Sequence, residues 1–446
     1  MVALIVLVAF ESLAVATAMP VVGHDLKGLS LYALAFSGTL AASMIATVLG
    51  GRWADLRGPV APLWTGVVTF SGGLVIAGLA HTMDVFVLGR FVQGFGGGIF
   101  QVSMYVLVSR VYPAAMHPRV FAVFAACWVV PSMVGPAVAG TVVEHLGWRW
   151  VFLGVPLLVL PAALLLWRGL APASPAPASP APASPAPASP ASGSAENLPE
   201  TGKRIPILRK LGWTVLTAVG AVLMQYGGAA RGAGTVLLAA GLAVLILSLP
   251  RLLPSGTLRA ARGLPAVIAL RGIVTGTVLG SEVFLPLMLT AERGLSPTQA
   301  GMVLTSGALA WSAAAWIMGH KRYDRVLILR IGPALIAAGI LLMALTVFQG
   351  VPVLVAVLGE IIAGFGIGLV YPTLSVLVLE MSNPGEEGDN SASLGIGELV
   401  FTVVTVAVVG AIVAVFGAVG PVYLACFGLT ALLAGTGVLV GGRFRT

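Results

Sequence analysis

Long apolar runs separated by short polar clusters make up most of the chain. A helix needs roughly 20 mainly apolar residues to cross a hydrocarbon core about 30 Å thick. Cutting the sequence where Pro, Gly and charged residues interrupt such runs predicts an all-α polytopic membrane protein with about fourteen spans. The predicted spans are 2–22, 30–50, 61–80, 84–108, 120–143, 150–168, 211–229, 233–253, 265–290, 298–319, 326–348, 352–380, 391–416 and 419–440.

The composition agrees with this pattern. Of the 446 residues 58% are hydrophobic and 9% are charged, whereas soluble domains are about 25% charged. The composition therefore excludes a soluble enzyme, a disordered protein and a nucleic-acid partner, and makes the lipid bilayer the surroundings of the chain. Cys127 and Cys426 lie far apart in apolar stretches, so we expect neither a disulfide scaffold nor a metal site, and no cofactor.

Positive charge is distributed unevenly over the loops. Of the 24 Lys and Arg residues, 18 fall in the tail and the loops predicted for one side and four fall on the other. Because Lys and Arg are retained on the cytoplasmic side, we expect a multi-pass protein of the inner (plasma) membrane with both termini in the cytoplasm.

Four copies of Ala-Pro-Ala-Ser-Pro occupy residues 171–190. Such a segment favours extended polyproline conformations and builds no core. The sequence therefore divides into an N-terminal six-helix half, a cytoplasmic linker, two inserted helices and a C-terminal six-helix half. The expected boundaries are 1–168, 169–210, 211–253 and 254–446.

An internal repeat supports the two halves, since repeats are typical of transporter folds. Three matches share one spacing: Leu88–Gly98 with Leu358–Gly368 at 270, Gly50–Asp55 with Gly319–Asp324 at 269, and Glu11 with Glu282 at 271. Six of the eleven positions in the first match are identical.

Five ionisable residues fall within spans, where charge is expensive and marks proton or substrate pathways. Glu11 lies ten residues into its span, roughly 15 Å from the start of the helix, so it can take up and release a proton as water access changes. Glu282, Glu360 and Glu398 should face the protein interior, and Arg90 can stabilise a nearby carboxylate. The alternatives are a merely structural Glu11, an interfacial Glu398 and an Arg90 that snorkels to the surface.

Two further stretches suggest gating elements. In Gly51–Gly58, the glycines Gly51 and Gly58 allow a tight turn and Asp55 is expected near the start of the third helix, able to pair with an arginine. In the fifth span, Gly135, Pro136 and Gly140 allow close helix packing and a bend; packing alone is a sufficient alternative. Aromatic candidates for a substrate cavity are Tyr32, Trp128, Phe284 and Trp311.

These stretches carry a resemblance that covers nearly the whole chain. Phe10–Pro20, Gly51–Gly58, Leu88–Gly94 and Val130–Gly140 resemble motifs of the major facilitator superfamily, and within it of the fourteen-helix drug/proton antiporters. The family more often has Asp in place of Glu11, and glycine where Pro131 and Ala139 stand. The resemblance implies the major facilitator fold, proton coupling through Glu11 and Arg90, and export by exchange with protons.

The sequence thus predicts a monomeric secondary transporter that exports hydrophobic or cationic small molecules in exchange for protons. A dedicated exporter or proton symporter of one metabolite has the same fold and remains an alternative. A membrane-embedded enzyme or a sensor has less support, because the sequence has no His cluster or Ser/Lys dyad, and no phosphate-binding loop for ATP.

Overall fold

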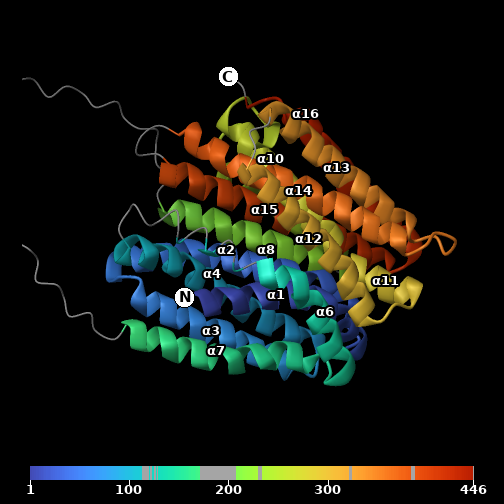
Figure 1. Cartoon of the computed structure of the whole chain (residues 1–446), viewed down its shortest axis with the longest axis horizontal. Helices are drawn as coiled ribbons and strands as arrows, with labels where there is room; N and C mark the ends of the chain where they lie inside the picture. The colour runs from blue at the N-terminus through green and yellow to red at the C-terminus, as the bar shows by residue number, and fades with distance from the viewer. Residues whose placement is uncertain are drawn as a thin grey trace, which may run out of the picture.

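A computed structural model describes residues 1–112, 120, 123–124, 127, 129–170, 207–229, 234–320, 324–382 and 387–444. Within these residues the chain is all helical, and most helices run side by side along one direction (Figure 1). Trp128 and most of the predicted 169–210 linker lie outside the described residues.

The helices of the N-terminal half lie close to the spans predicted from the sequence. Its described helices are α1 (Val2–Asp25), α2 (Tyr32–Arg57), α3 (Val60–Gly78), α4 (Met83–Val111), α6 (Val129–His145) and α7 (Arg149–Leu170). Helix α4 begins where the Thr82 hydroxyl accepts the backbone N–H of Val85 at 3.4 Å, a capping bond that satisfies a free donor at the helix start.

The C-terminal half repeats this arrangement with one interruption. Its helices are α10 (Leu264–Glu282), α11 (Leu285–Arg293), α12 (Pro297–His320), α13 (Arg325–Leu345), α14 (Leu354–Glu380), α15 (Glu387–Phe416) and α16 (Gly420–Val440). Helices α10 and α11 together fill the predicted span 265–290, and they are separated by a break at Val283 and Phe284. Pro286, near the start of α11, has no N–H to continue the helical ladder.

The count of membrane-spanning segments agrees with the prediction of about fourteen. Twelve described segments are long and apolar enough to cross a membrane, with α10 and α11 taken together. Helices α6 and α8 occupy the other two predicted spans. The chain is therefore a multi-pass membrane protein.

The glycines of the first repeat explain its packing. Gly94 and Gly98 of α4 lie against the backbone of Thr39 and Ser43 in α2, and a Cβ at either glycine would clash with a backbone carbonyl. Glycine therefore allows α4 to approach α2 closely.

The second repeat packs in the same way. Gly364 and Gly368 of α14 lie against the backbone of Gly307 and Trp311 in α12. The glycines follow their N-terminal counterparts by 270 residues and their contacts follow by 268. The sequence repeat is thus a repeat of helix contacts.

The two inserted helices form a hairpin, α8 (Ile207–Ala229) and α9 (Gly234–Leu252). Inside the hairpin the hydroxyl oxygens of Thr217 and Ser248 are hydrogen-bonded at 2.9 Å, and both residues are buried. Helix α8 packs against both α2 and α15. The hairpin therefore covers the seam where one helix of each half meets.

The side of the bundle that carries Arg57 and Arg259 is called the basic side below, and the other side carries His145 and Arg293. The two halves meet where α6 and α1 pack on α12 and where α2 packs on α15. Helices α6 and α11 lie at the right-hand end of the bundle in Figure 1, which is the side opposite the basic side.

Candidate functional site

Glu11 and Arg90 form a buried ion pair between α1 and α4. Arg90 Nη1 lies 2.6 Å from Glu11 Oε1, and the two residues are 5% and 3% exposed. The same Nη1 lies 2.5 Å from Gln93 Oε1, and Arg90 Nε donates to the carbonyl of Ala35 at 3.2 Å. The guanidinium is therefore directed into the protein and joins α1, α2 and α4; it does not snorkel towards the surface.

A buried pair of this kind is sensitive to the loss of either partner. Removing one charge leaves the other uncompensated in a low-dielectric interior, which is strongly unfavourable. Protonation of Glu11 would likewise leave the Arg90 guanidinium with the neutral acceptors of Gln93 and Ala35. The state of the Glu11 carboxyl is thus coupled to the packing of three helices.

Glu282 and Glu360 occupy the matching positions of the C-terminal half. Glu360 on α14 is 1% exposed, and its Oε1 has no hydrogen-bond partner among the described residues. Its Oε2 fills the space beside Gly307 on α12, where a Cβ would overlap the carboxylate. Glu282, the last residue of α10, is half-buried and near enough to interact electrostatically with Glu360.

Glu398 on α15 is paired with a residue that the sequence did not single out as functional. Arg271 on α10 donates from Nε to Glu398 Oε2 at 2.9 Å. Its Nη1 donates to the carbonyl of Tyr371 at 2.8 Å and to Ser375 Oγ at 3.0 Å. Because the Glu398 side chain is 20% exposed, this acid faces a protein partner and is not simply interfacial.

Two predicted aromatic residues meet where the halves join. Tyr32 opens α2 and is fully buried, and its ring centroid lies 5.6 Å from that of Phe284, which is also buried. Trp311 lies elsewhere, on α12, with its ring 5.7 Å from Tyr371 of α14. The structure therefore groups Tyr32 with Phe284 and places Trp311 beside Tyr371, whose backbone carbonyl accepts a hydrogen bond from Arg271.

The predicted fifth-span motif packs against the other half. Gly140 of α6 lies against the backbone of Thr298 at the start of α12, and the Pro136 backbone lies where a Cβ of Gly301 would be. Gly135 lies beside Phe10 of α1. These close approaches hold α6 and α12 together near the side opposite the basic side.

The loop motif forms the end of α2 on the basic side. Gly58 ends the helix with a φ of +85°, as a glycine at a tight turn allows. Gly51 lies within α2, in ordinary contact with Val102. The backbone of Asp55 lies in the last turn of α2, two residues before the helix ends at Arg57. The sequence placed Asp55 near the start of the third helix, but α3 begins five residues later, at Val60.

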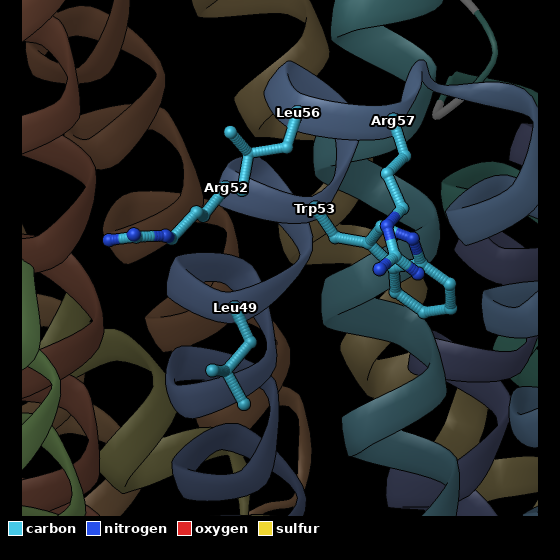
Figure 2. Close-up of a pocket in the computed structure, with 5 residues that line it drawn as sticks. All are labelled: Leu49, Arg52, Trp53, Leu56 and Arg57. Carbon is cyan, nitrogen blue, oxygen red and sulfur yellow. The ribbon is translucent and has the colours of Figure 1, made fainter.

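A cavity of about 330 Å³ adjoins this motif, lined by Leu49, Arg52, Trp53, Leu56 and Arg57. Figure 2 shows Arg52 extending from α2 on the side away from Trp53 and Arg57. The cavity thus lies at the basic end of α2 and not around the buried acids.

Sequence reasoning missed Arg271, the partner of Glu398, and the two residues that accept hydrogen bonds from Arg271. Arg271, Tyr371 and Ser375 were visible only as an arginine near a span edge and two ordinary polar residues. The position of Arg271 eleven residues before Glu282 on the same helix is the signal that both face the interior. Gly307 carries no sequence signal for its contact with Glu360, since that contact depends on tertiary packing.

The family model of the Major Facilitator Superfamily matches residues 1–281, more than half of the chain. The chain belongs to the major facilitator superfamily. This membership agrees with the expected fold and with the two repeated halves described above.

This chain is similar in sequence to bacterial multidrug transporters. It is 29% identical over 163 residues to the multidrug transporter protein MdtP of Bacillus subtilis, over 36% of this chain and 30% of that protein. It is 21% identical over 382 residues to the multidrug efflux pump SdrM of Staphylococcus aureus, over 84% of this chain and 80% of that protein. The chain spans 52% of two MFS-type transporters of Mycobacterium tuberculosis.

Solved structures of other transporters share the fold of this chain. A POT family transporter in complex with 5-aminolevulinic acid matches with a TM-score of 0.66 and 13% identity, over 100% of this chain and 96% of that chain. At this identity the similarity shows the fold alone.

Proposed function

We propose that this transporter is a proton-coupled antiporter that exports hydrophobic or cationic small molecules by alternating access. The observation that carries the proposal is the buried pair of Glu11 and Arg90, 2.6 Å apart near the middle of α1. A carboxyl at this depth binds a proton or a cation partner to offset the loss of hydration. The similarity to multidrug transporters supports drug export as the use of that proton.

In the proposed cycle Glu11 is the proton carrier. Protonation weakens its attraction for Arg90, so the contacts that join α1, α2 and α4 depend on whether Glu11 holds a proton. Glu282, Glu360 and Glu398 are proposed to take part in coupling. One proton moving through a 100 mV potential supplies about 2.3 kcal/mol, which supports a roughly 50-fold gradient of a neutral substrate.

The proposed orientation has the basic side in the cytoplasm of a bacterial inner membrane. The excess of Lys and Arg on that side supports this orientation. The contacts between α6 and α12 would then close the outer side, as alternating access requires of one state. We further propose a monomer with no enzymatic activity, organised as 1–168, 169–210, 211–253 and 254–446.

Two measurements on the purified protein test the proposal. Addition of a transported drug to the unbuffered protein should release protons, and proteoliposomes with an imposed pH gradient should accumulate the drug against its own gradient. A panel of toxic compounds in a host without its own pumps identifies which drugs to use. Drug transport that is indifferent to the pH gradient would overturn proton coupling, and accumulation along the proton gradient would indicate a symporter.

A further inference from the structure

Four arginines gather on the basic side of the C-terminal half. Arg259 and Arg262 lie in the connection between α9 and α10, Arg330 lies in the second turn of α13, and Arg443 follows the end of α16. All four residues are exposed. The proposed transport cycle gives none of them a task, so their position calls for another explanation.

The connection between α9 and α10 is tied to the end of α16. Arg443 Nη1 donates to the backbone carbonyls of Arg259 and Ala260, at 3.3 and 3.4 Å. The carbonyl of Arg443 accepts the backbone N–H of Gly263, which directly follows Arg262, at 3.0 Å. Ala260 has a φ of +45°, which is uncommon for a residue with a Cβ. The bonds to Arg443 therefore hold the connection, with its two arginines, in a defined shape.

Arg330 joins the cluster through Gly442. A Cβ at Gly442 would lie 2.6 Å from Arg330 Nη2, so the glycine leaves room for this guanidinium next to Arg443. Among the side chains that the structure describes, no carboxylate lies within ion-pair distance of any of the four arginines. Arg325, five residues earlier on α13, has its own partner in Glu380. The four positive charges are thus uncompensated, and because like charges repel, a bound anion would stabilise the arrangement.

The ends of the membrane-spanning segments set the depth of the cluster. The segments Gly234–Leu252, Leu264–Arg293, Arg325–Leu345 and Gly420–Val440 are long and apolar enough to cross a membrane. All four arginines lie near the ends of these segments on the basic side. This is the level of the lipid headgroups, at the edge of the hydrocarbon core. The anion that is most abundant there is the phosphodiester of a phospholipid.

Exposed apolar side chains accompany the arginines. Leu258, Leu327 and Leu439 are 50%, 55% and 73% exposed. Leu258 directly precedes Arg259, and Leu327 lies three residues before Arg330, a spacing that makes the two neighbours on the surface of α13. Acyl chains cover such leucines, whereas a soluble anion gains nothing from them. The surface therefore suits an anionic head that carries apolar tails.

We propose that the cluster of four arginines is a binding site for an anionic phospholipid, whose acyl chains lie along Leu327 and Leu439. A guanidinium group is a planar fork that can donate two parallel hydrogen bonds to one phosphate. The bound lipid bridges the α9–α10 connection, α13 and α16, and so links the inserted hairpin to the C-terminal half. The site depends neither on proton coupling nor on the transported substrate.

Binding of a fluorescent phosphatidylglycerol to the purified full-length protein in detergent tests the site. Arg259→Gln with Arg330→Gln removes two charges whose side chains form no hydrogen bond or ion pair among the described residues, so the fold should be kept. Each basic residue near an anionic membrane surface contributes about fivefold in affinity, so this double variant should bind about 25-fold more weakly. Arg52→Gln with Arg57→Gln is the matched control. It removes two exposed arginines from the basic side of the N-terminal half and should bind within about twofold of the wild type.

Two further measurements separate the lipid site from its alternatives. Glycerol 3-phosphate carries the phosphate without acyl chains and should not displace the labelled lipid at equal concentration; displacement would assign the site to soluble phosphate compounds and overturn the lipid. Phosphatidylglycerol should raise the thermal midpoint of the wild type and of the control more than that of the Arg259→Gln, Arg330→Gln variant. Equal losses of binding in the two double variants would mean that diffuse positive charge attracts the lipid, and would also overturn the site.

Discussion

The hydroxyl of Tyr32 donates a hydrogen bond to the backbone carbonyl of Val283, 3.0 Å away. Tyr32 begins α2 in the N-terminal half, and Val283 lies in the break between α10 and α11. A helix break leaves carbonyls without their usual partners. One side chain therefore satisfies the break in one half and ties it to the other half.

Tyr32→Phe should shift the transporter towards the state that is open on the side opposite the basic side. The variant keeps the ring against Phe284 but loses a hydrogen bond worth about 1 kcal/mol, so the open population should rise roughly fivefold. Distances between spin labels across α6 and α12 measure that population. An unchanged distance distribution would mean that the bond forms equally in both states.

Glu11→Gln should keep the fold and part of the substrate binding but abolish proton-coupled transport. Gln is nearly isosteric with Glu and still offers Arg90 an oxygen, but its amide cannot take up and release a proton near neutral pH. Glu11→Asp should keep partial activity with an altered pH profile, since the carboxyl is drawn back by one methylene.

Transport under an imposed pH gradient, together with drug-induced proton release, measures the effect. Glu282→Gln is the paired variant: if the repeat has preserved the function of Glu11, it should also impair proton coupling, whereas a purely structural Glu282 would mainly reduce stability or expression. Coupling in Glu11→Gln equal to that of the wild type would move Glu11 from proton carrier to a packing role.

Arg271→Met should destabilise the protein by about 3 kcal/mol, because it leaves Glu398 without its buried partner. It also removes the bonds to Ser375 and to the carbonyl of Tyr371. The double variant Arg271→Met with Glu398→Leu should recover much of the loss, because no charge then remains unpaired. Thermal unfolding in detergent gives both values, and equal stability of the single and double variants would contradict this account.

The positions of the helices could be predicted because lipid requires about 20 apolar residues per span, a requirement that is local in sequence. The break at Val283 was not predicted, since Pro286 can either bend a helix or end it. Glu11 and Arg90 could be singled out by the cost of burying charge. The contact of Arg90 with Ala35 depends on how α2 packs on α4, whereas Gln93 lies three residues further along α4 itself.

The C-terminal half shows the limit of the repeat. The offset of 270 residues correctly pairs Gly94 with Gly364, because the same close packing needs glycine in both halves. The same offset pairs Arg90 with Glu360, where the charge is reversed. A repeat therefore predicts backbone contacts, while the side chains that carry chemistry have diverged between the halves.

Glu144→Gln should remove a pH dependence from the closed contact between α6 and α12. Glu144 accepts the backbone N–H of Thr298 at 2.9 Å. A bond from the Ser296 side chain, and then this backbone bond, lower the pKa of Glu144 below its ordinary value. A group with a lowered pKa stabilises the closed contact above its ordinary pKa, and the stabilisation is lost as the pH falls through the lowered value.

The side opposite the basic side should therefore open more readily below about pH 4. The pH effect should be small, because Glu144 is exposed to solvent. Spin labels at Leu146 and Phe348, both exposed, report the opening. Glu144→Gln should open to the same extent at pH 4 and pH 7, and a persisting pH response in this variant would assign the effect to another group.

Cysteines introduced at Ser174 and Thr446 should resist a membrane-impermeant thiol reagent in intact cells, because the basic side is expected to face the cytoplasm. Leu146→Cys is the matched control: Leu146 is 64% exposed on the other side and should react. The native Cys127 and Cys426 are buried and contribute little background. Labelling at 174 or 446 with protection at 146 would reverse the topology.

The α8–α9 hairpin makes the two flanks of the transporter unequal towards lipid. On one flank α8 lies across α2 and α15, and on the other α6 meets α12 with no inserted helix among the described residues. A hydrophobic molecule dissolved in the bilayer therefore meets the hairpin on the first flank and not the interface between the two halves. If the proposed export function holds, we expect substrates that enter sideways from the lipid to do so at the α6 and α12 flank, which would give the transporter a preferred direction of approach within the plane of the membrane.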